Sequence, residues 1–527
     1  MRSHSESKSG QKTRQARLHL EHLESRLAPA TVGNDVLWRT YTPAQAFSLH
    51  SNPTSTKKIY LDFNGQTVSG TGWNTSWNGG NAFTHLAWSI DTDRTTFSAV
   101  ERDKIIKMWR MVAEDFASFN VDVTTEDPGV AGLTYSGGSD TTWGVRAIIG
   151  PIPDSSVVSS PPSAGGIAYV GTFKNATDLP CFVWNGDSDP NPEGSLDITV
   201  SHEVGHTLGL GHDGGTADPN YYGGHGTGLV SWGPIMGAPF ERSVTQWSMN
   251  TYPGANNSQD DLAVIASSGN GLGYRTDDYG NSTSGAKALN GIGQGTLNTL
   301  YGTIEQTTDF DVFSFKANAG AINIKIDSLK IPGQTAGQPA GANLDILAEV
   351  LNSTGGVIAT NNPTASLDAA FTINLPANGT YYLRISGAGL APFNTTGYPK
   401  YASLGSYRIT GTVVTPSAPK DSVRVMNPTR WVYNYATGTY DGGVTVTNVS
   451  GAPLTGPIVF VFTLPPGVTF VPTAGWAASQ AGSQLRITYY GTINANSAIT
   501  IPFKLIKPSN VVLLTGYNTY FTDIGAV

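Results

Sequence analysis

The sequence predicts a multidomain protein in which an α/β (α+β) region precedes two all-β sandwich domains. The chain has 527 residues, which at roughly 150 residues per domain suggests about three domains. It contains 62 glycines, 31 prolines and only 13% charged residues, a composition typical of β-rich exported proteins. Helical periodicity is found only before about residue 270, so the β-domains are expected after it.

The α/β prediction depends on short apolar strands that alternate with two longer helices. A helix over 98–119 is expected to start with a capping box, Ser98 and Glu101, and to bury one apolar stripe. A second helix is expected around 197–208, capped by Asp197, Thr199 or Ser201. Strands are predicted at 58–63, 121–123, 145–149 and 166–171. We assign residues 57–270 to this domain and 31–56 to a leader with little pattern.

Short alternating runs bounded by Gly, Asn, Pro or Asp fill the rest of the chain. They predict a first β-sandwich over 273–415 and a second over 422–527. The intervening run Val414–Pro419 is rich in Pro and Ser and is typical of a linker.

The N-terminal segment 1–30 is basic and lacks the apolar stretch of a standard signal peptide. The run Leu20–Arg26 resembles a short motif at the N-terminus of many large exported bacterial proteins, which favours an export or sorting segment over a disordered tail. No apolar run approaches 18 residues, so no transmembrane segment is expected. The net charge of −8 argues against a nucleic-acid partner. The single cysteine, Cys181, excludes an internal disulfide.

One eleven-residue string contains the candidate metal ligands and the candidate general base: His-Glu-Val-Gly-His-Thr-Leu-Gly-Leu-Gly-His over 202–212. On a helix, positions four apart share a face, so His202 and His206 can offer ring nitrogens to one metal ion. A glycine at 209 can adopt positive φ and end the helix, which lets His212 approach the same ion. Three histidines leave one coordination position open, as catalytic zinc requires. Glu203 is then placed to act as general base.

This string resembles the long zinc motif of metzincin metallopeptidases. A second resemblance is the run Gly233–Gly237, which is similar to the family's methionine turn and makes Met236 the residue packed beneath the zinc. The resemblance implies a metzincin-like catalytic domain with one catalytic Zn²⁺ and a specificity pocket between the zinc helix and that turn. Some metzincins place a catalytic tyrosine two residues after the methionine, where this chain has Ala238; Tyr252 is a distant substitute.

The run Gly166, Ile167, Ala168, Tyr169 resembles the upper edge strand of the reprolysin-like branch. By that resemblance it binds an extended polypeptide by strand addition. A plain interior strand is the alternative.

Other candidates have an ordinary alternative beside the functional one. His225 is a loop residue or a fourth ligand, and Asp213 is a carboxylate that orients a ligand ring or an ordinary acidic residue. Cys181 is a small buried hydrophobe or an inhibitory thiolate. A Ca²⁺ site is possible in the acidic loop that contains Asp187, Asp189 and Glu193, although the loop fits no standard calcium motif.

Residues 277–413 resemble the bacterial pre-peptidase C-terminal domain, through Asp309–Phe315, Asn343–Asp345 and Gly379–Ile385. The final domain resembles immunoglobulin-like modules. Together these resemblances imply a zinc-dependent endopeptidase, secreted or at the cell surface, whose C-terminal domains aid secretion or attachment to a surface or matrix. The alternative is a surface binding or adhesion protein in which the sandwich domains act and the metal domain is minor.

Overall fold

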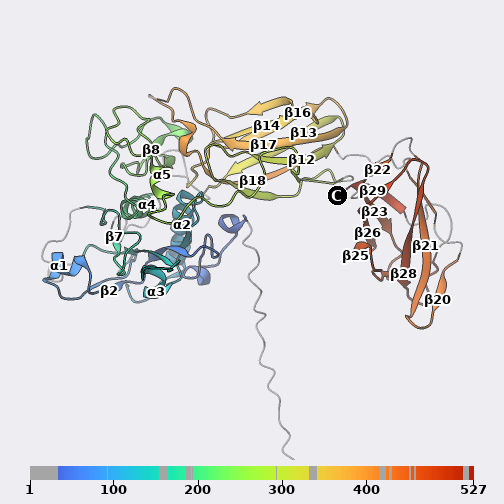
Figure 1. Cartoon of the computed structure of the whole chain (residues 1–527), viewed down its shortest axis with the longest axis horizontal. Coiled ribbons are helices and arrows are strands. Elements are labelled where there is room, and N and C mark those ends of the chain that lie inside the picture. The colour runs from blue at the N-terminus through green and yellow to red at the C-terminus, as the bar shows by residue number, and fades with distance from the viewer. Residues whose placement is uncertain are drawn as a thin grey trace, which may run out of the picture.

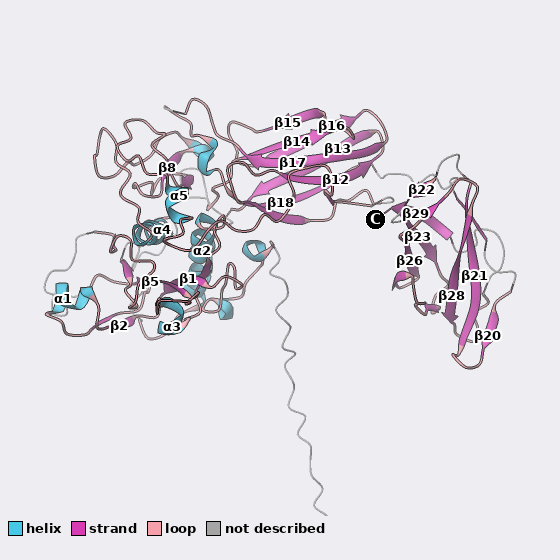
Figure 2. Ribbon diagram, viewed as in Figure 1, coloured by secondary structure: helices cyan, strands magenta, loops and turns pink. Residues whose placement is uncertain are grey.

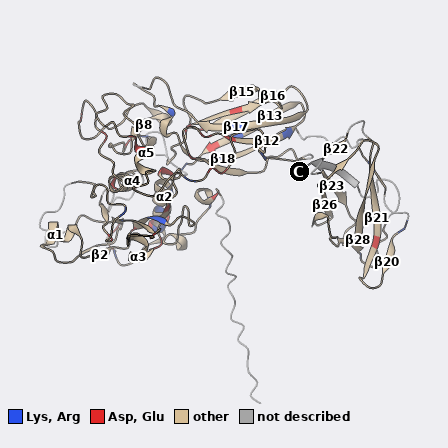
Figure 3. Cartoon of the chain, viewed as in Figure 1, with Lys and Arg blue, Asp and Glu red and all other residues tan. Residues whose placement is uncertain are grey.

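The computed structural model describes residues 34–513 and 521–526, except for 92, 154–163, 185–191, 193, 292–293, 331–340, 394, 415–422, 427–429, 450–452 and 456–457. An α/β N-terminal region is followed by several antiparallel β-sheets (Figures 1 and 2). Charged residues are spread thinly along the described chain (Figure 3). No helix among the described residues is long and apolar enough to cross a membrane.

The N-terminal region is organised by a five-stranded sheet in the order β4-β1-β5-β7-β6. Four of its strands run parallel and β6 is antiparallel at one edge. The strands are β1 Lys57–Asp62, β4 Asp122–Thr124, β5 Trp143–Ile149, β6 Gly166–Ile167 and β7 Cys181–Val183. The central strand β5 is buried along its whole length, as expected when helices and loops cover both faces of a parallel sheet.

Two helices, α2 (Ala99–Asp115) and α4 (Leu196–Thr207), contact each other beside this sheet. The predicted capping box is present, because Ser98 accepts a hydrogen bond from the Glu101 amide and Glu101 accepts one from the Ser98 amide. Helix α2 stops at Asp115, four residues before the predicted end, because the chain turns at 116–120 to enter β4. The N-cap of α4 is Ser195, and the three predicted caps, Asp197, Thr199 and Ser201, all lie within the helix. Asp197, in the first turn, accepts a hydrogen bond from the Gly194 amide.

Shorter elements complete this region. The segment predicted as a leader packs against the α/β core, where Val36, Leu37, Ala46 and Leu49 are buried. The remaining elements are η1 Val36–Trp38, η2 Pro43–Gln45, β2 Gln66–Val68, α1 Gly72–Asn78, β3 Phe83–His85, α3 Gly129–Leu133, η3 Gly228–Val230, β8 Trp232–Pro234, β9 Val244–Gln246 and α5 Asp261–Ile265.

The middle of the chain forms two sheets, in the orders β10-β12-β17-β14-β15 and β11-β18-β13-β16. All of their pairings are antiparallel except β10 with β12. The strands are β10 Lys287–Ala288, β11 Leu300–Ile304, β12 Asp311–Ala317, β13 Gly320–Ser328, β14 Ile346–Leu351, β15 Val357–Asn361, β16 Ala369–Leu375, β17 Gly379–Gly387 and β18 Gly405–Thr412; η4 covers Lys400–Ala402.

The last part of the chain is also antiparallel and has its own hydrophobic cluster, from Val423 to Leu505. Its larger sheets are β19-β21-β28-β24, with β20 beside β21, and β25-β26-β23-β29. The strands are β19 Val423–Met426, β20 Val432–Asn434, β21 Thr439–Asn448, β22 Leu454–Thr455, β23 Ile458–Thr463, β24 Thr469–Phe470, β25 Ala477–Ala481, β26 Gln484–Tyr489, β27 Thr492–Ile493, β28 Ala498–Ile506 and β29 Phe521–Ala526.

The N-terminal region and the middle sheets are joined by apolar and polar contacts. One hydrophobic cluster contains Val204 of α4 together with Phe313 and Ile346 of the middle sheets. At the same junction the Ser406 amide donates to the buried carboxylate of Glu114 over 2.7 Å. The Asn343 side-chain amide donates to Asp115 over 2.7 Å. These two parts therefore share a continuous interior, whereas the last part has a separate one.

Candidate metal centre

Helix α4 and the turn after it bring three histidine rings together. His202 and His206 lie one turn apart on the helix, with ring centroids 4.7 Å apart. The His212 ring lies 5.2 Å from that of His202 and 4.7 Å from that of His206. One nitrogen from each ring falls within 4.8 Å of the others, close enough for the three to hold one metal ion.

The return of His212 toward the helix depends on Gly209. Helix α4 ends at Thr207, and Gly209 follows with φ +106°, a conformation that residues with a Cβ rarely adopt. The Leu210 amide then donates to the Gly205 carbonyl over 3.0 Å, which closes the helix end. The turn that the spacing predicted is therefore present at Gly209.

Backbone carbonyls set the orientation of two of the rings. The Nδ1 atom of His202 lies 2.9 Å from the Ile235 oxygen, and that of His206 lies 2.8 Å from the Leu210 oxygen. Because a carbonyl oxygen only accepts, each Nδ1 carries the proton and donates it. Each Nε2 therefore keeps its lone pair for a metal ion.

Burial supplies the charge states that a metal site requires. It lowers the pKa of His202 to about 3, with a further contribution from the neighbouring His206, and it also lowers the pKa values of His206 and His212. The rings are therefore neutral, as ligands must be. Burial raises the pKa of Glu203 to about 8, and Oε2 of this carboxylate is buried without a hydrogen-bond partner. A divalent cation beside Glu203 would favour its ionised form, so the residues fit a metal ion.

Met236 lies fully buried against α4, and its contact explains a glycine that sequence reasoning did not single out. A Cβ added to Gly205 would lie 2.5 Å from the Met236 sulfur. Only glycine lets this methionine pack so close to the helix between the two ligands His202 and His206. The signal in the sequence is weak, since the two residues are separated by a long loop.

The structure places β6 at the edge of the described sheet, antiparallel to β7, and not in its interior. The strand is shorter than predicted, because only Gly166 and Ile167 pair with β7. Ala168 and Tyr169 lie beyond it, and the Tyr169 ring packs against Trp73 at 4.3 Å. A Cβ at Gly166 would meet Oε1 of Glu203 at 2.6 Å, so this strand passes directly beside the candidate base.

A cavity of about 230 Å³ opens between β6, α4 and the turn after Met236. Its polar lining includes His202 and Glu203, and most of its remaining lining is apolar or glycine. Tyr221 also lines it, with its ring 4.5 Å from that of His212. Sequence reasoning missed Tyr221, which lies in a loop without a recognisable pattern.

Three further candidate residues from the sequence, His225, Asp213 and Tyr252, have other hydrogen-bond partners. His225 has both ring nitrogens occupied, one by the Tyr222 hydroxyl at 2.8 Å and the other by the Gly397 carbonyl at 2.6 Å, which argues against a fourth ligand. Asp213 accepts from the Ser248 hydroxyl and does not orient a ligand ring. The Tyr252 hydroxyl donates to the Gly214 carbonyl.

The remaining two candidates are the cysteine and the acidic loop. Cys181 is fully buried on β7, and burial raises the pKa of its thiol, so it is a structural residue there. The proposed calcium residues Asp187, Asp189 and Glu193 lie outside the described residues.

A site of this kind is that of a metallopeptidase. The reprolysin-like metallopeptidase family M12B matches residues 155–213, a span that contains the three histidines. The bacterial pre-peptidase C-terminal domain matches residues 309–387. The chain therefore carries a reprolysin-like metallopeptidase domain with a histidine triad, followed by a pre-peptidase C-terminal domain, and its substrate class is polypeptide.

Two solved structures resemble parts of the chain. The pre-peptidase C-terminal domain of a collagenase from Bacillus anthracis is 16% identical, covering 24% of this chain and 94% of that one, with a TM-score of 0.16. A protein from Eubacterium rectale described as secreted is 12% identical, covering 47% and 80%, with a TM-score of 0.15. Scores this low carry no structural argument. No curated protein matches the chain.

Proposed function

We propose that this protein is a secreted zinc-dependent endopeptidase of the metzincin type, with His202, His206 and His212 as zinc ligands and Glu203 as general base. The observation that carries the proposal is the close approach of three neutral histidines beside an unpartnered buried carboxylate. A zinc ion held there supplies Lewis-acid chemistry, which polarises a carbonyl and makes water more acidic. Secretion is inferred from the pre-peptidase C-terminal domain.

In this mechanism Glu203 accepts a proton from the attacking water and later delivers it to the leaving amine. Its position beside β6 supports that role, because Oε1 approaches the strand along which substrate would lie. An extended polypeptide would add, through backbone hydrogen bonds, to the edge of β6 that no described strand pairs with. We assign Met236 and Gly209 structural roles, one packing under the zinc helix and the other turning the chain.

The boundaries that accompany this proposal are 57–270 for the peptidase domain, then β-sandwiches over 273–415 and 422–527, the last immunoglobulin-like. The alternative, a surface binding protein with a minor metal domain, lacks a specific observation in its favour. A degraded site would have lost Glu203 or a ligand, and this chain retains all four residues.

The metal proposal is tested by removing and restoring the ion. Purified protein treated with a chelator should lose zinc and casein hydrolysis together, and added zinc should restore both. Metal content and peptide-bond cleavage are measured on the same samples. Protein that binds no zinc after metal is added back would contradict the assignment of the three histidines, whereas zinc-loaded protein without activity would contradict only the peptidase step.

The apolar cavity predicts a preference for substrates with an apolar side chain next to the scissile bond. Replacing Ala238 with Leu should fill the cavity and lower kcat/KM for substrates with Leu or Phe at that position by about 10- to 100-fold. Substrates with Gly or Ala there should be affected much less. A peptide series that varies one residue measures this difference, and an equal loss for all substrates would argue against the cavity as a specificity pocket.

A second cation site is proposed at the start of the middle sheets. Asp277, Glu305 and Asp309 form one acidic group, and Asp277, Asp278 and Asp311 form another, each with oxygens within 4.8 Å of one another. Glu305 is only 1% exposed, and neither of its carboxylate oxygens has a hydrogen-bond partner. Buried oxygens without donors require a cation or protons, and a hard cation such as Ca²⁺ prefers such ligands.

The pKa values of this acidic cluster predict how calcium should act. Burial, followed by the charge of Asp278, raises the pKa of Glu305 to about 11, and burial raises that of Asp311 to about 10. The native state therefore holds protons that the unfolded chain releases above about pH 4, so stability without calcium should fall as pH rises from about 4 toward 8. Added Ca²⁺ should raise Tm more at pH 8 than at pH 5, with zinc held constant. An equal response at both pH values, or the same response in Glu305→Gln, would contradict this site.

A further inference from the structure

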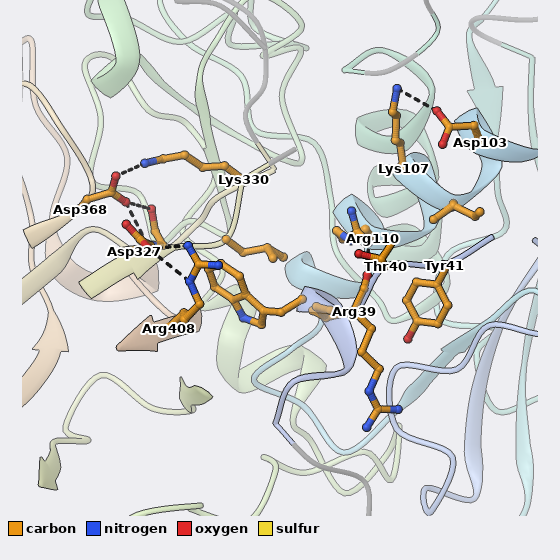
Figure 4. A pocket seen from close by; sticks show the side chains of 15 residues that line it. Arg39, Thr40, Tyr41, Asp103, Lys107, Arg110, Asp327, Lys330, Asp368 and Arg408 are labelled. Atoms are coloured by element: carbon orange, nitrogen blue, oxygen red, sulfur yellow. Dashed lines mark hydrogen bonds and ion pairs between the residues drawn. The ribbon is translucent and has the colours of Figure 1, made fainter. Parts of the chain in front are cut away.

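A second charged cavity, apart from the one at the metal site, lies at the junction of the two joined parts, far from α4 in sequence. It has a volume of about 680 Å³ and is lined by the segment 37–41, by α2, by the end of β13 and the two residues after it, by Asp368, and by Arg408 of β18 (Figure 4). This volume falls in the range of ordinary small-ligand sites. Its apolar wall includes Leu37, Ile106 and Leu329, and Trp38 and Tyr41 add aromatic surface.

The charges in this cavity are unequal. Its lining contains five cationic side chains, from Arg39, Lys107, Arg110, Lys330 and Arg408, and three carboxylates, from Asp103, Asp327 and Asp368. Each carboxylate is already paired: Asp103 with Lys107 at 3.0 Å, Asp327 with Arg408 at 2.7 Å, and Asp368 with Lys330. The paired groups are seen as dashed contacts on both sides of Figure 4.

Arg110 is the cation of this lining that forms no ion pair with a carboxylate of the described residues. Its Nη2 atom donates to the Arg39 carbonyl over 2.9 Å at the exposed side, while its Nε atom is covered and has no acceptor. Arg39 in turn pairs with Asp35 at 2.8 Å, outside the cavity lining. Burial also lowers the pKa of Arg110, and the nearby Tyr41 and Asp103 offset this effect only in part.

The buried polar atoms without hydrogen-bond partners indicate which kind of ligand the cavity would bind. Among the lining residues, the buried side-chain atoms without a hydrogen-bond partner are Trp38 Nε1 and Arg110 Nε, and both are donors. A ligand that completes the site must therefore bring acceptor atoms and negative charge. A carboxylate fits a guanidinium in the bidentate geometry that arginine favours.

We propose that this cavity is a binding site for a carboxylate carried on an apolar body, with Arg110 as the residue that recognises the carboxylate. The two peptide sources of such a group are a free C-terminus and an acidic side chain. The apolar and aromatic wall beside Arg110 contacts the rest of the ligand. The site lies apart from the three histidines, so the proposal does not depend on the proposed peptidase activity.

The test uses the full chain carrying Glu203→Gln, so that no probe is hydrolysed, and three short peptides. These are acetyl-Leu-Leu-Phe with a free carboxyl end, the same peptide as its amide, and acetyl-Leu-Glu-Phe amide. Calorimetric titration should show binding of the first or the third, and binding of the Leu-Leu-Phe amide at least tenfold weaker. Binding of the first alone identifies a C-terminal carboxylate as the ligand, and binding of the third alone identifies a side-chain carboxylate.

The role of Arg110 is tested by Arg110→Gln against Arg102→Gln, which removes an arginine from the same helix outside the cavity lining. The first should weaken binding of the carboxylate peptide at least tenfold, and the second should leave it unchanged. Three results would each overturn the proposal. They are equal binding of the Leu-Leu-Phe acid and its amide by the protein with intact Arg110, no binding of any peptide, and unchanged binding in Arg110→Gln. The acid-against-amide comparison needs no substitution in the cavity, so it stands even if Arg110→Gln misfolds.

Discussion

Replacing Glu203 with Gln should lower kcat for peptide hydrolysis by about 100- to 10,000-fold, the range expected when general acid–base catalysis is lost. Gln has nearly the shape of Glu but cannot accept the proton of the attacking water at neutral pH. The ring contacts that orient His202 and His206 involve the carbonyls of Ile235 and Leu210, not Glu203. Zinc content should therefore stay unchanged while turnover falls.

A matched control is Glu241→Gln, which makes the same substitution at an exposed residue just beyond the cavity lined by Phe240. It should retain the activity of the unmodified protein. The measurement is kcat and zinc content for both variants prepared in parallel. If Glu203→Gln kept zinc and full activity, another group would have to move the proton, and the mechanism proposed for this site would be wrong.

The approach of the three histidines to one another was predictable from the sequence because its geometry is local. The four-residue spacing of His202 and His206 becomes one helix face, and the turn that returns His212 needs only Gly209. The capping box at Ser98 is equally local, and it is present. Such features depend on residues a few positions apart, where helix geometry fixes distance and direction.

Contacts between distant segments were not predictable in the same way. Nothing near Gly205 in the sequence indicates that Met236 will press against it, and nothing marks Tyr221 as a neighbour of His212. Helix α2 ends at Asp115 because the chain turns at 116–120 to enter β4, whereas the apolar stripe taken alone continues to 119. In each case the partner comes from a loop or domain whose path no local pattern specifies.

The second large effect is expected from truncation. A chain cut after residue 415 should fold and keep a Tm close to that of the full chain, because the part it loses has a separate hydrophobic cluster. A chain cut after residue 270 should not fold cooperatively. It would expose half of a shared interior and would leave the buried carboxylates of Glu114 and Asp115 without Ser406 and Asn343. Thermal unfolding of the two truncated chains and the full chain measures this difference.

A point substitution separates the polar contacts of this junction from the loss of apolar surface. Asn343→Ala removes a donor to the buried Asp115 carboxylate and should cost about 1–3 kcal/mol of unfolding free energy. The same substitution at Asn374, which is exposed on β16, should cost much less. If the chain cut after 270 folded with the Tm of the full chain, the pre-peptidase C-terminal domain would be a removable appendage. The expected result instead makes it part of the folded body that holds α2 and, through Ser201 and Asp115, the zinc helix in place.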